Sequence, residues 1–206
     1  MLEASELDCR RGGRALFRGL CFALRGGELL RVAGENGSGK TSLLKILCGL
    51  LTPDQGEVRW RGEPIRRLRE DYARNLVYLG HAPAVKDDLT AAENLSIACT
   101  LAGIEAPARS VHEALARYGL PAGQAPVRKL SQGQRRRAAL ARLLLSQGVP
   151  LWLLDEPFAA LDAAAVELTR GLILEHVARG AAVIYTTHQA DGLKESRVVD
   201  LDAAAA

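Results

Sequence analysis

Short apolar runs of strand length alternate along this 206-residue chain with stretches in which apolar residues recur at helical spacing. The runs are continuous and bounded by glycine, proline or polar residues, which is typical of strands buried on both faces. They cover residues 29–33, 75–80, 151–155, 181–188 and 196–201. The helical spacing covers residues 42–51, much of 90–120, 134–146 and 164–179. Strands that alternate with helices predict an α/β fold with a mainly parallel sheet.

Local patterns add three expectations to this outline. Residues 57–65 follow a turn at 52–56 and predict a short hairpin-like pair of strands. Ser110 and Glu113 have the spacing of a capping box, so we expect a helix to begin at Ser110. The residues from Asp202 onward predict a frayed end.

Composition and charge exclude several classes of protein. The chain has 48% hydrophobic residues, which is enough for a substantial core, and its 27 basic and 24 acidic residues leave a net charge of +3. That balance does not predict a nucleic-acid-binding surface. The longest apolar stretch, 95–104, is about half of the roughly 20 residues that a membrane span needs. With no signal peptide and no CxxC pair, we expect a cytosolic protein with buried, reduced thiols, whose membrane role depends on a partner.

A glycine-rich segment follows the first predicted strand and matches the phosphate-binding pattern G-x-x-x-x-G-K-[ST]. Such a loop curls so that its N–H groups converge on phosphate oxygens at the positive end of a helix. We expect Lys40 to reach the β- and γ-phosphates of a nucleotide and Thr41 to bind Mg²⁺. The expected binding residues are Gly34, Glu35, Asn36, Gly37, Ser38, Gly39, Lys40 and Thr41. This loop alone is equally compatible with kinases, GTPases and motor ATPases.

A second candidate anion-binding end lies at residues 130–134, Leu-Ser-Gln-Gly-Gln. A serine hydroxyl and glycine-exposed amides at a helix start can bind an anion. The segment resembles the ABC signature LSGGQ, with glutamine in place of its first glycine. In that family this end faces the ATP held by a second subunit, which implies a homodimer. The residues carried over from the resemblance are Ser131, Gln132, Gly133 and Gln134.

Two acidic residues end the apolar run at 151–155, and a histidine ends the run at 181–188. Adjacent acids at the end of a buried strand are costly unless they bind a cation or water. The segment resembles a Walker B strand, in which Asp155 would hold Mg²⁺ and Glu156 would act as general base on water. His188 resembles the switch histidine that contacts the γ-phosphate, and 158–162 resembles the D-loop. We therefore expect Glu156, His188 and Lys40 to be catalytic.

These motifs occur in the order found in ABC nucleotide-binding domains, and the resemblance covers nearly the whole chain. It implies one ABC ATPase domain over residues 1–206, with N-terminal antiparallel strands and a helical subdomain at about 85–147. It also implies ATP and Mg²⁺ as cofactors. Two positions depart from the family: His81 replaces a glutamine that contacts Mg²⁺ and water, and no aromatic residue for adenine stacking occurs near Arg11.

The run from Tyr78 to Leu95 resembles the GH-x-P-x-x-K and LTA-x-ENL pattern of one ABC subfamily, although Ala82 replaces an expected glutamine. This subfamily is the ATP-binding subunits of the cytochrome c maturation system, also called haem exporters. It implies a peripheral protein on the cytoplasmic face of the bacterial inner membrane. Its partners would be a polytopic membrane subunit and companion haem-handling proteins. The step would be haem export or ATP-driven release of a haem-loaded chaperone.

Other interpretations remain open at this point. The chain could be a soluble, non-transport ABC ATPase, such as one of iron–sulfur assembly, or the subunit of a different small ABC transporter. It could also be a nucleotide-gated scaffold with negligible hydrolysis, an interpretation that the departure at His81 favours. Retention of Lys40, Asp155, Glu156 and His188 argues against the scaffold.

Overall fold

The computed structural model describes residues 1–120, 125–188 and 192–204. Its centre is a parallel sheet of five strands in the order β6-β7-β8-β3-β9. These strands are β3 (Leu29–Ala33), β6 (Leu76–Leu79), β7 (Leu151–Leu154), β8 (Ala182–Thr186) and β9 (Arg197–Asp200). The predicted α/β fold and all five predicted strands are confirmed. β3 has the predicted bounds and the other four are shorter, and β9 is largely exposed rather than buried.

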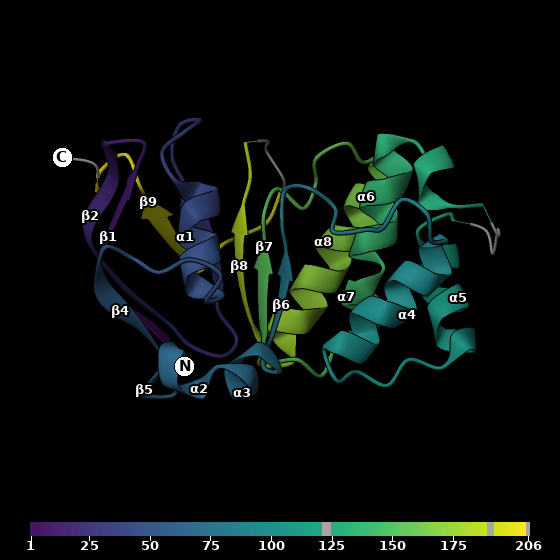
Figure 1. The fold of residues 1–206 in the computed structure, drawn as a ribbon, viewed down its shortest axis with the longest axis horizontal. Coiled ribbons are helices and arrows are strands. Elements are labelled where there is room, and N and C mark those ends of the chain that lie inside the picture. Colours follow the sequence, from purple (N-terminus) through teal and green to yellow (C-terminus); the bar gives the residue numbers. More distant parts are fainter. Residues whose placement is uncertain (121–124, 189–191, 205–206) are drawn as a thin grey trace.

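A second, antiparallel sheet has the order β2-β1-β4-β5. It comprises β1 (Leu2–Arg11), β2 (Arg14–Leu24), β4 (Gln55–Trp60) and β5 (Glu63–Pro64). The last two confirm the predicted hairpin-like pair, and β1 with β2 confirms the N-terminal antiparallel strands that the family resemblance implied. Helix α1 (Lys40–Leu47) packs between this sheet and the parallel one (Figure 1).

The remaining helices are grouped by position in the chain. Two short ones, α2 (Ile65–Leu68) and α3 (Glu70–Ala73), connect β5 to β6. Between β6 and β7 lie α4 (Ala91–Leu101), α5 (Ala108–Arg117), the 3₁₀ turn η1 (Val127–Lys129), α6 (Gln132–Leu140) and α7 (Arg142–Leu145). These gather at the end of the molecule opposite the antiparallel sheet, and α8 (Ala163–Ala178) lies between them and the parallel strands (Figure 1).

The central strands β7 and β8 are buried on both faces, and alternation along β7 divides the core into two clusters. Successive strand residues point to opposite faces. Trp152 and Leu154 therefore pack with α4–α8, while Leu151 and Leu153 pack with α1 and the antiparallel sheet. All four are completely buried. This burial explains why the strand is continuously apolar up to Asp155.

Several local expectations are wrong. Helix α5 begins at Ala108 after Pro107, so Ser110 lies inside its first turn and caps nothing. Proline favours the start of a helix because its φ is preset and its missing N–H is not needed there. The single helix expected over 134–146 is two helices, α6 and α7.

The chain end and the thiols also differ from expectation. The Arg18 N–H donates to the carbonyl of Ala204 at 3.0 Å, so residues 202–204 pack on β2 instead of fraying. Cys9 and Cys99 are buried as expected, and Cys48 is half-buried. Cys21 is exposed, and its thiol donates to Glu6 Oε1 at 3.0 Å.

Candidate nucleotide-binding site

The glycine-rich loop joins β3 to α1, and steric contacts at two glycines explain its sequence. Gly39 precedes α1 with φ 108°, and a Cβ added there would lie 3.0 Å from the Cβ of Leu16. Gly34 has φ 140°, and its added Cβ would lie 2.5 Å from the Ser38 hydroxyl. Any larger residue at either position would be strained and crowded. The loop is thus shaped so that backbone N–H groups, rather than side chains, line its inner face.

Lys40 crosses the mouth of this loop. Its side chain is largely buried, and Nζ donates to the carbonyls of Gly34 at 2.7 Å and Glu35 at 2.8 Å. Burial lowers the pKa of this ammonium, while the negative charges of Glu156, Asp202 and Asp155 act in the opposite direction. A buried cation that is bonded to neutral carbonyls is available for an anion that enters the loop.

Asp155 follows β7 and is the most buried acid of the site, with 2% of its surface exposed. Thr41 Oγ1 donates to its Oδ2 at 2.8 Å, and Thr186 Oγ1 donates to its Oδ1 at 2.9 Å. A hydroxyl and a carboxylate side by side are ligands that Mg²⁺ prefers. Within the described ranges, no cluster of three or more His, Cys, Asp or Glu could hold a metal alone. Mg²⁺ would therefore depend on phosphate oxygens for its remaining ligands.

Glu156 has an unusual backbone conformation, with φ 52°. Its N–H donates to Thr186 Oγ1 at 2.8 Å, so one threonine hydroxyl holds both acids. Its carboxylate Oε1 lies 3.3 Å from Nε2 of His188. A non-glycine residue in the left-handed region is uncommon and occurs often at functional sites. Two of the three expected catalytic side chains, Glu156 and His188, are therefore neighbours.

One pocket of about 590 Å³ collects most of the predicted residues. It lies between the loop, the ends of β6, β7 and β8, and the start of β2. Its lining residues are Arg11, Leu16, Asn36, Gly37, Gly39, Lys40, Thr41, Ser42, His81, Asp155, Glu156, Ala159 and His188. The structure thus brings together a phosphate-binding loop, two acids and two histidines, with Arg11 and Leu16 at one side.

The segment 131–134 lies outside this pocket, at the start of α6. Ser131 caps the helix: its Oγ accepts the Gln134 N–H at 3.2 Å, and the Gln134 side chain accepts the Ser131 N–H at 2.8 Å. A Cβ added to Gly133 would lie 2.8 Å from the carbonyl of Ala160, so this glycine is required by close packing. Ser131 and Gln132 are exposed to solvent. Within the described chain they are free to face another molecule.

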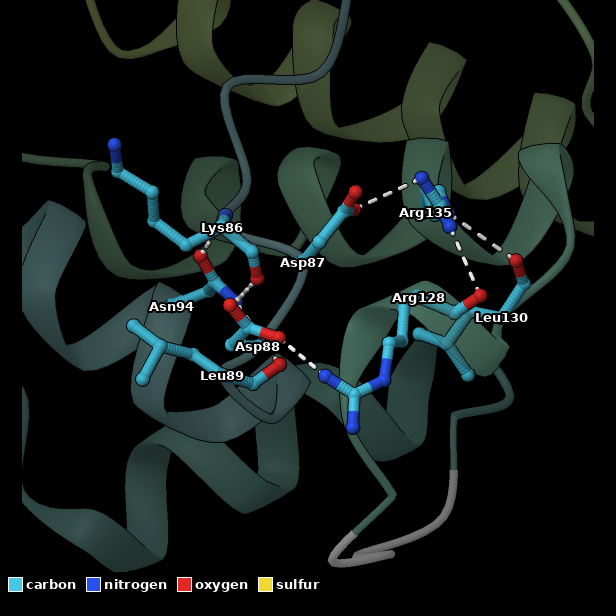
Figure 2. A network of polar contacts seen from close by, with 8 residues as sticks. All are labelled: Lys86, Asp87, Asp88, Leu89, Asn94, Arg128, Leu130 and Arg135. Carbon is cyan, nitrogen blue, oxygen red and sulfur yellow. Dashed lines mark hydrogen bonds and ion pairs between the residues drawn. The ribbon is translucent and has the colours of Figure 1, made fainter.

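A polar network ties the start of α6 to the loop that follows His81 (Figure 2). Arg135 Nη1 contacts Asp87 Oδ1 at 3.0 Å, and a second ion pair joins Arg128 to Asp88. Asn94 accepts the Lys86 N–H at 2.6 Å and donates to the Lys86 carbonyl at 3.0 Å. The loop at 86–89 and the segment at 128–135 are therefore held as one unit.

Two contributors to the site gave no signal in the sequence analysis. Asp202 Oδ2 accepts the Glu35 N–H at 2.8 Å and so anchors the entry of the loop, 167 residues away in sequence. Thr186 holds Asp155 and Glu156 as described above. Only the position of Thr186 at the end of a predicted strand beside His188 could have suggested it.

The sequence of this chain is similar to those of known proteins. A family model described as ABC transporter matches residues 17–159. The cytochrome c biogenesis ATP-binding export protein CcmA of Nitrosomonas europaea is 54% identical over 190 residues, which is 92% of this chain and 89% of that protein. The protein of the same name from Dechloromonas aromatica is 49% identical over 203 residues, which is 98% of each chain.

Solved structures resemble the fold. The ATP-binding subunit of an ABC transporter superposes with a TM-score of 0.81 and 26% identity, over 91% of this chain and 79% of that one. The MJ0796 ABC transporter cassette, described as dimeric, superposes with a TM-score of 0.84 and 22% identity, over 97% and 94%.

Proposed function

This chain belongs to the ABC transporter family and, within it, to the cytochrome c biogenesis ATP-binding export proteins. We propose that its pocket binds and hydrolyses ATP and that this hydrolysis drives a step of cytochrome c biogenesis at the membrane. The chain is an ABC ATPase. The relatives favour an export subunit of cytochrome c biogenesis over a soluble ATPase of iron–sulfur assembly. The mechanism rests on one observation: a single pocket is lined by Lys40, Asp155, Glu156 and His188.

In the bound state, the triphosphate lies in the loop at 34–41, and Lys40 exchanges its two carbonyl partners for β- and γ-phosphate oxygens. Thr41 and Asp155 would hold Mg²⁺, which neutralises charge on the same oxygens. The base and ribose would lie near Arg11 and Leu16, which also line the pocket. His81 lines the same pocket as Glu156 and His188 and would be available to the γ-phosphate.

Hydrolysis begins with a water between Glu156 and the γ-phosphate. The Glu156 carboxylate accepts a proton from this water as the water oxygen bonds to the γ-phosphorus. The bond between that phosphorus and the oxygen that bridges the β- and γ-phosphates then breaks, which leaves ADP and inorganic phosphate. His188 and Lys40 donate to the oxygens on which negative charge increases. Glu156 has a left-handed backbone conformation and lines the pocket.

Two copies would complete two such sites. Ser131 and Gln132 are exposed at a helix start, and they lie outside their own chain's pocket. Facing the ATP of a second copy, Ser131, Gly133 and Gln134 would supply a hydroxyl, a backbone amide and a side-chain amide to its γ-phosphate. This arrangement links hydrolysis to closure of the dimer.

The ATPase acts with membrane partners. No helix in the described ranges is long and apolar enough to cross a membrane. The proposed partner is a polytopic subunit that receives the loop at 81–95 on the cytoplasmic face of the inner membrane. Companion haem-handling proteins complete the complex, and the driven step is haem export or release of a haem-loaded chaperone. The exposed end of the 86–89 loop, joined to the start of α6, would transmit closure to that subunit.

The partner assignment is tested by affinity purification of the tagged chain from detergent-solubilised native membranes. Mass spectrometry and a haem absorbance scan of the eluate should recover a polytopic subunit together with haem-binding proteins. Recovery of soluble partners alone would contradict the export role. Replacing Lys40 with methionine is the control that separates ATP-dependent partners from constitutive ones.

The base assignment is tested by the Glu156→Gln variant. Turnover should fall by at least about a hundredfold, as is usual for loss of a general base, while ATP binding persists. Light scattering should then show a dimer in ATP that the double variant with Lys40→Met does not form. Wild-type turnover by Glu156→Gln would remove Glu156 from the role of base.

A further inference from the structure

Helix α6, the signature helix because it begins in the segment 131–134, contains three successive arginines, and the contacts of the middle one differ from those of the other two. Arg136, in the second turn of α6, is 4% exposed. Its Nη1 donates to the carbonyls of Gly80 at 2.7 Å and His81 at 3.2 Å. Its Nη2 donates to the carbonyls of Asp155 and Glu156, each at 2.7 Å. One guanidinium therefore binds four backbone carbonyls.

These carbonyls lie immediately beyond the carboxyl ends of two neighbouring strands, β6 and β7. The planar guanidinium suits this arrangement because its donors form a fixed fork. The adjacent arginines contact other parts of the chain: Arg135 contacts Asp87, and Arg137 contacts Asp162. Of the three, Arg136 alone reaches the backbone of the catalytic residues in the described structure.

The choice of acceptors has a chemical consequence. A buried cation normally pairs with a carboxylate. Burial lowers the pKa of Arg136, and the negative charges of Asp155 and Glu156 act in the opposite direction. Arg136 nevertheless bonds the backbone of these two acids and not their side chains. The charge of the arginine stabilises both carboxylates at short range, and their oxygens remain available for metal and water.

The backbone at Glu156 also needs support. A φ of 52° is strained for a residue other than glycine. The Thr186 hydroxyl fixes its N–H, and Arg136 fixes its carbonyl. Both peptide groups of the strained residue are therefore held, one from β8 and one from the signature helix.

We propose that Arg136 is a positioning residue that sets the orientation of Glu156 from the signature helix, so that the base and the helix facing the second ATP move as one body. This inference rests on the proposed function and deepens it. A shift of α6 on dimer closure is passed directly to the residue that activates water, and at the same time to the backbone of His81.

The test uses Arg136→Lys and Arg136→Gln in the full chain, purified with its membrane partner. Lysine keeps the charge but cannot span four carbonyls. We expect turnover to fall about a hundredfold, since a displacement of about 1 Å in a catalytic group has an effect of that order. Affinity for a fluorescent ATP analogue should change less than about twofold, because the phosphate loop is untouched. Arg142→Gln, which alters a partly buried arginine on α7, is the control and should retain turnover.

A second experiment distinguishes positioning of Glu156 from a general effect on stability: the Arg136→Lys substitution is made in a Glu156→Gln background. If Arg136 acts through Glu156, Arg136→Lys should barely alter the residual single-turnover rate there. An equal loss in both backgrounds, or a loss that follows only the drop in Tm, would overturn the proposal, as would unchanged turnover in both Arg136 variants. Absence of turnover in the wild-type complex would instead contradict the proposed ATPase mechanism, which separates the two failures.

Discussion

Thr186 shows how much of the site rests on single hydroxyl groups outside the sequence motifs. It is completely buried at the end of β8. Its one oxygen donates to Asp155 and accepts from the N–H of Glu156. A hydroxyl can do both because it carries one proton and two lone pairs.

Replacing Thr186 with valine keeps the shape of this side chain and removes both hydrogen bonds. A buried carboxylate oxygen and a buried N–H then lose a partner, so the free energy of unfolding should fall by about 1–3 kcal/mol. Turnover should fall as well, since Glu156 loses one of its two backbone contacts. Urea unfolding and ATPase assays measure these effects. Thr186→Ser is the control and should stay close to wild type in both.

Arg11 occupies the side of the pocket where the sequence lacks an aromatic residue. A guanidinium plane can stack on adenine, at about 0.5–1 kcal/mol for an exposed site. We expect Arg11→Ala to weaken ATP binding by about two- to fivefold and Arg11→Tyr to restore it. Affinity for inorganic tripolyphosphate should not change, because that ligand has no base. Arg10→Ala is the control, and equal weakening of both ligands would instead assign Arg11 to the phosphates.

At the scale of elements, two capping boxes fix the starts of the helices that matter for coupling. Thr90 caps α4 with Glu93, at the end of the loop that follows His81, and Ser131 caps α6 with Gln134. The network of Figure 2 lies between these two helix starts. Its ion pairs are exposed enough to contribute little each, so backbone bonds such as Val127 N–H to Leu89 O carry much of the connection.

The Thr90 cap can be compared with a site where only the sequence suggested one. Thr90→Ala should lower the free energy of unfolding by about 1 kcal/mol, the usual cost of losing a capping side chain. Ser110→Ala should change it by less than about 0.5 kcal/mol, because Ser110 lies inside α5 and caps nothing. Urea denaturation of both variants measures these changes in the free energy of unfolding. A larger loss at Ser110 would mean that α5 begins later than Ala108 in solution.

The sequence predicted the parallel sheet because its strands are apolar on both faces, and it predicted the loop and acids of the pocket because their spacing is local. It did not predict Arg136, Thr186 or Asp202. Arg136 bonds carbonyls, which every residue carries, so no residue type marks its targets. Asp202 contacts a residue 167 positions away. The false cap at Ser110 arose because Pro107 starts the helix earlier.

For the whole molecule, a pH response should come from a histidine outside the site. His176 on α8 is completely buried and stacks on Trp152 of β7, with ring centroids 3.6 Å apart. Burial, helped by the positive charge of Arg179, lowers the pKa of His176 to about 4. The ring is therefore neutral in the folded protein at neutral pH and must be protonated at a cost in acid.

The sign of the effect follows from proton binding. Between pH 6.5 and about 4, His176 is protonated in the unfolded chain but not in the folded protein. The free energy of unfolding therefore decreases as pH falls through this window. The difference amounts to about 3 kcal/mol. His176→Phe keeps a stacked ring and should remove this component, whereas His112→Gln, at an exposed position of α5, should not. Urea unfolding at pH 7, 6, 5 and 4 measures it, and parallel wild-type and His176→Phe curves would contradict it.

The order of strands in the parallel sheet has a consequence for how the protein is made. β3, which carries the phosphate loop, is paired on one side with β8 and on the other with β9. Both neighbours are synthesised some 150 residues after it, and a chain leaves the ribosome from its N-terminus. The loop therefore emerges early but gains its flanking strands, and the Asp202 anchor, only after these later residues have been made. We therefore expect a nascent chain that lacks these residues not to hold ATP, because its loop has neither neighbouring strand nor the Asp202 anchor.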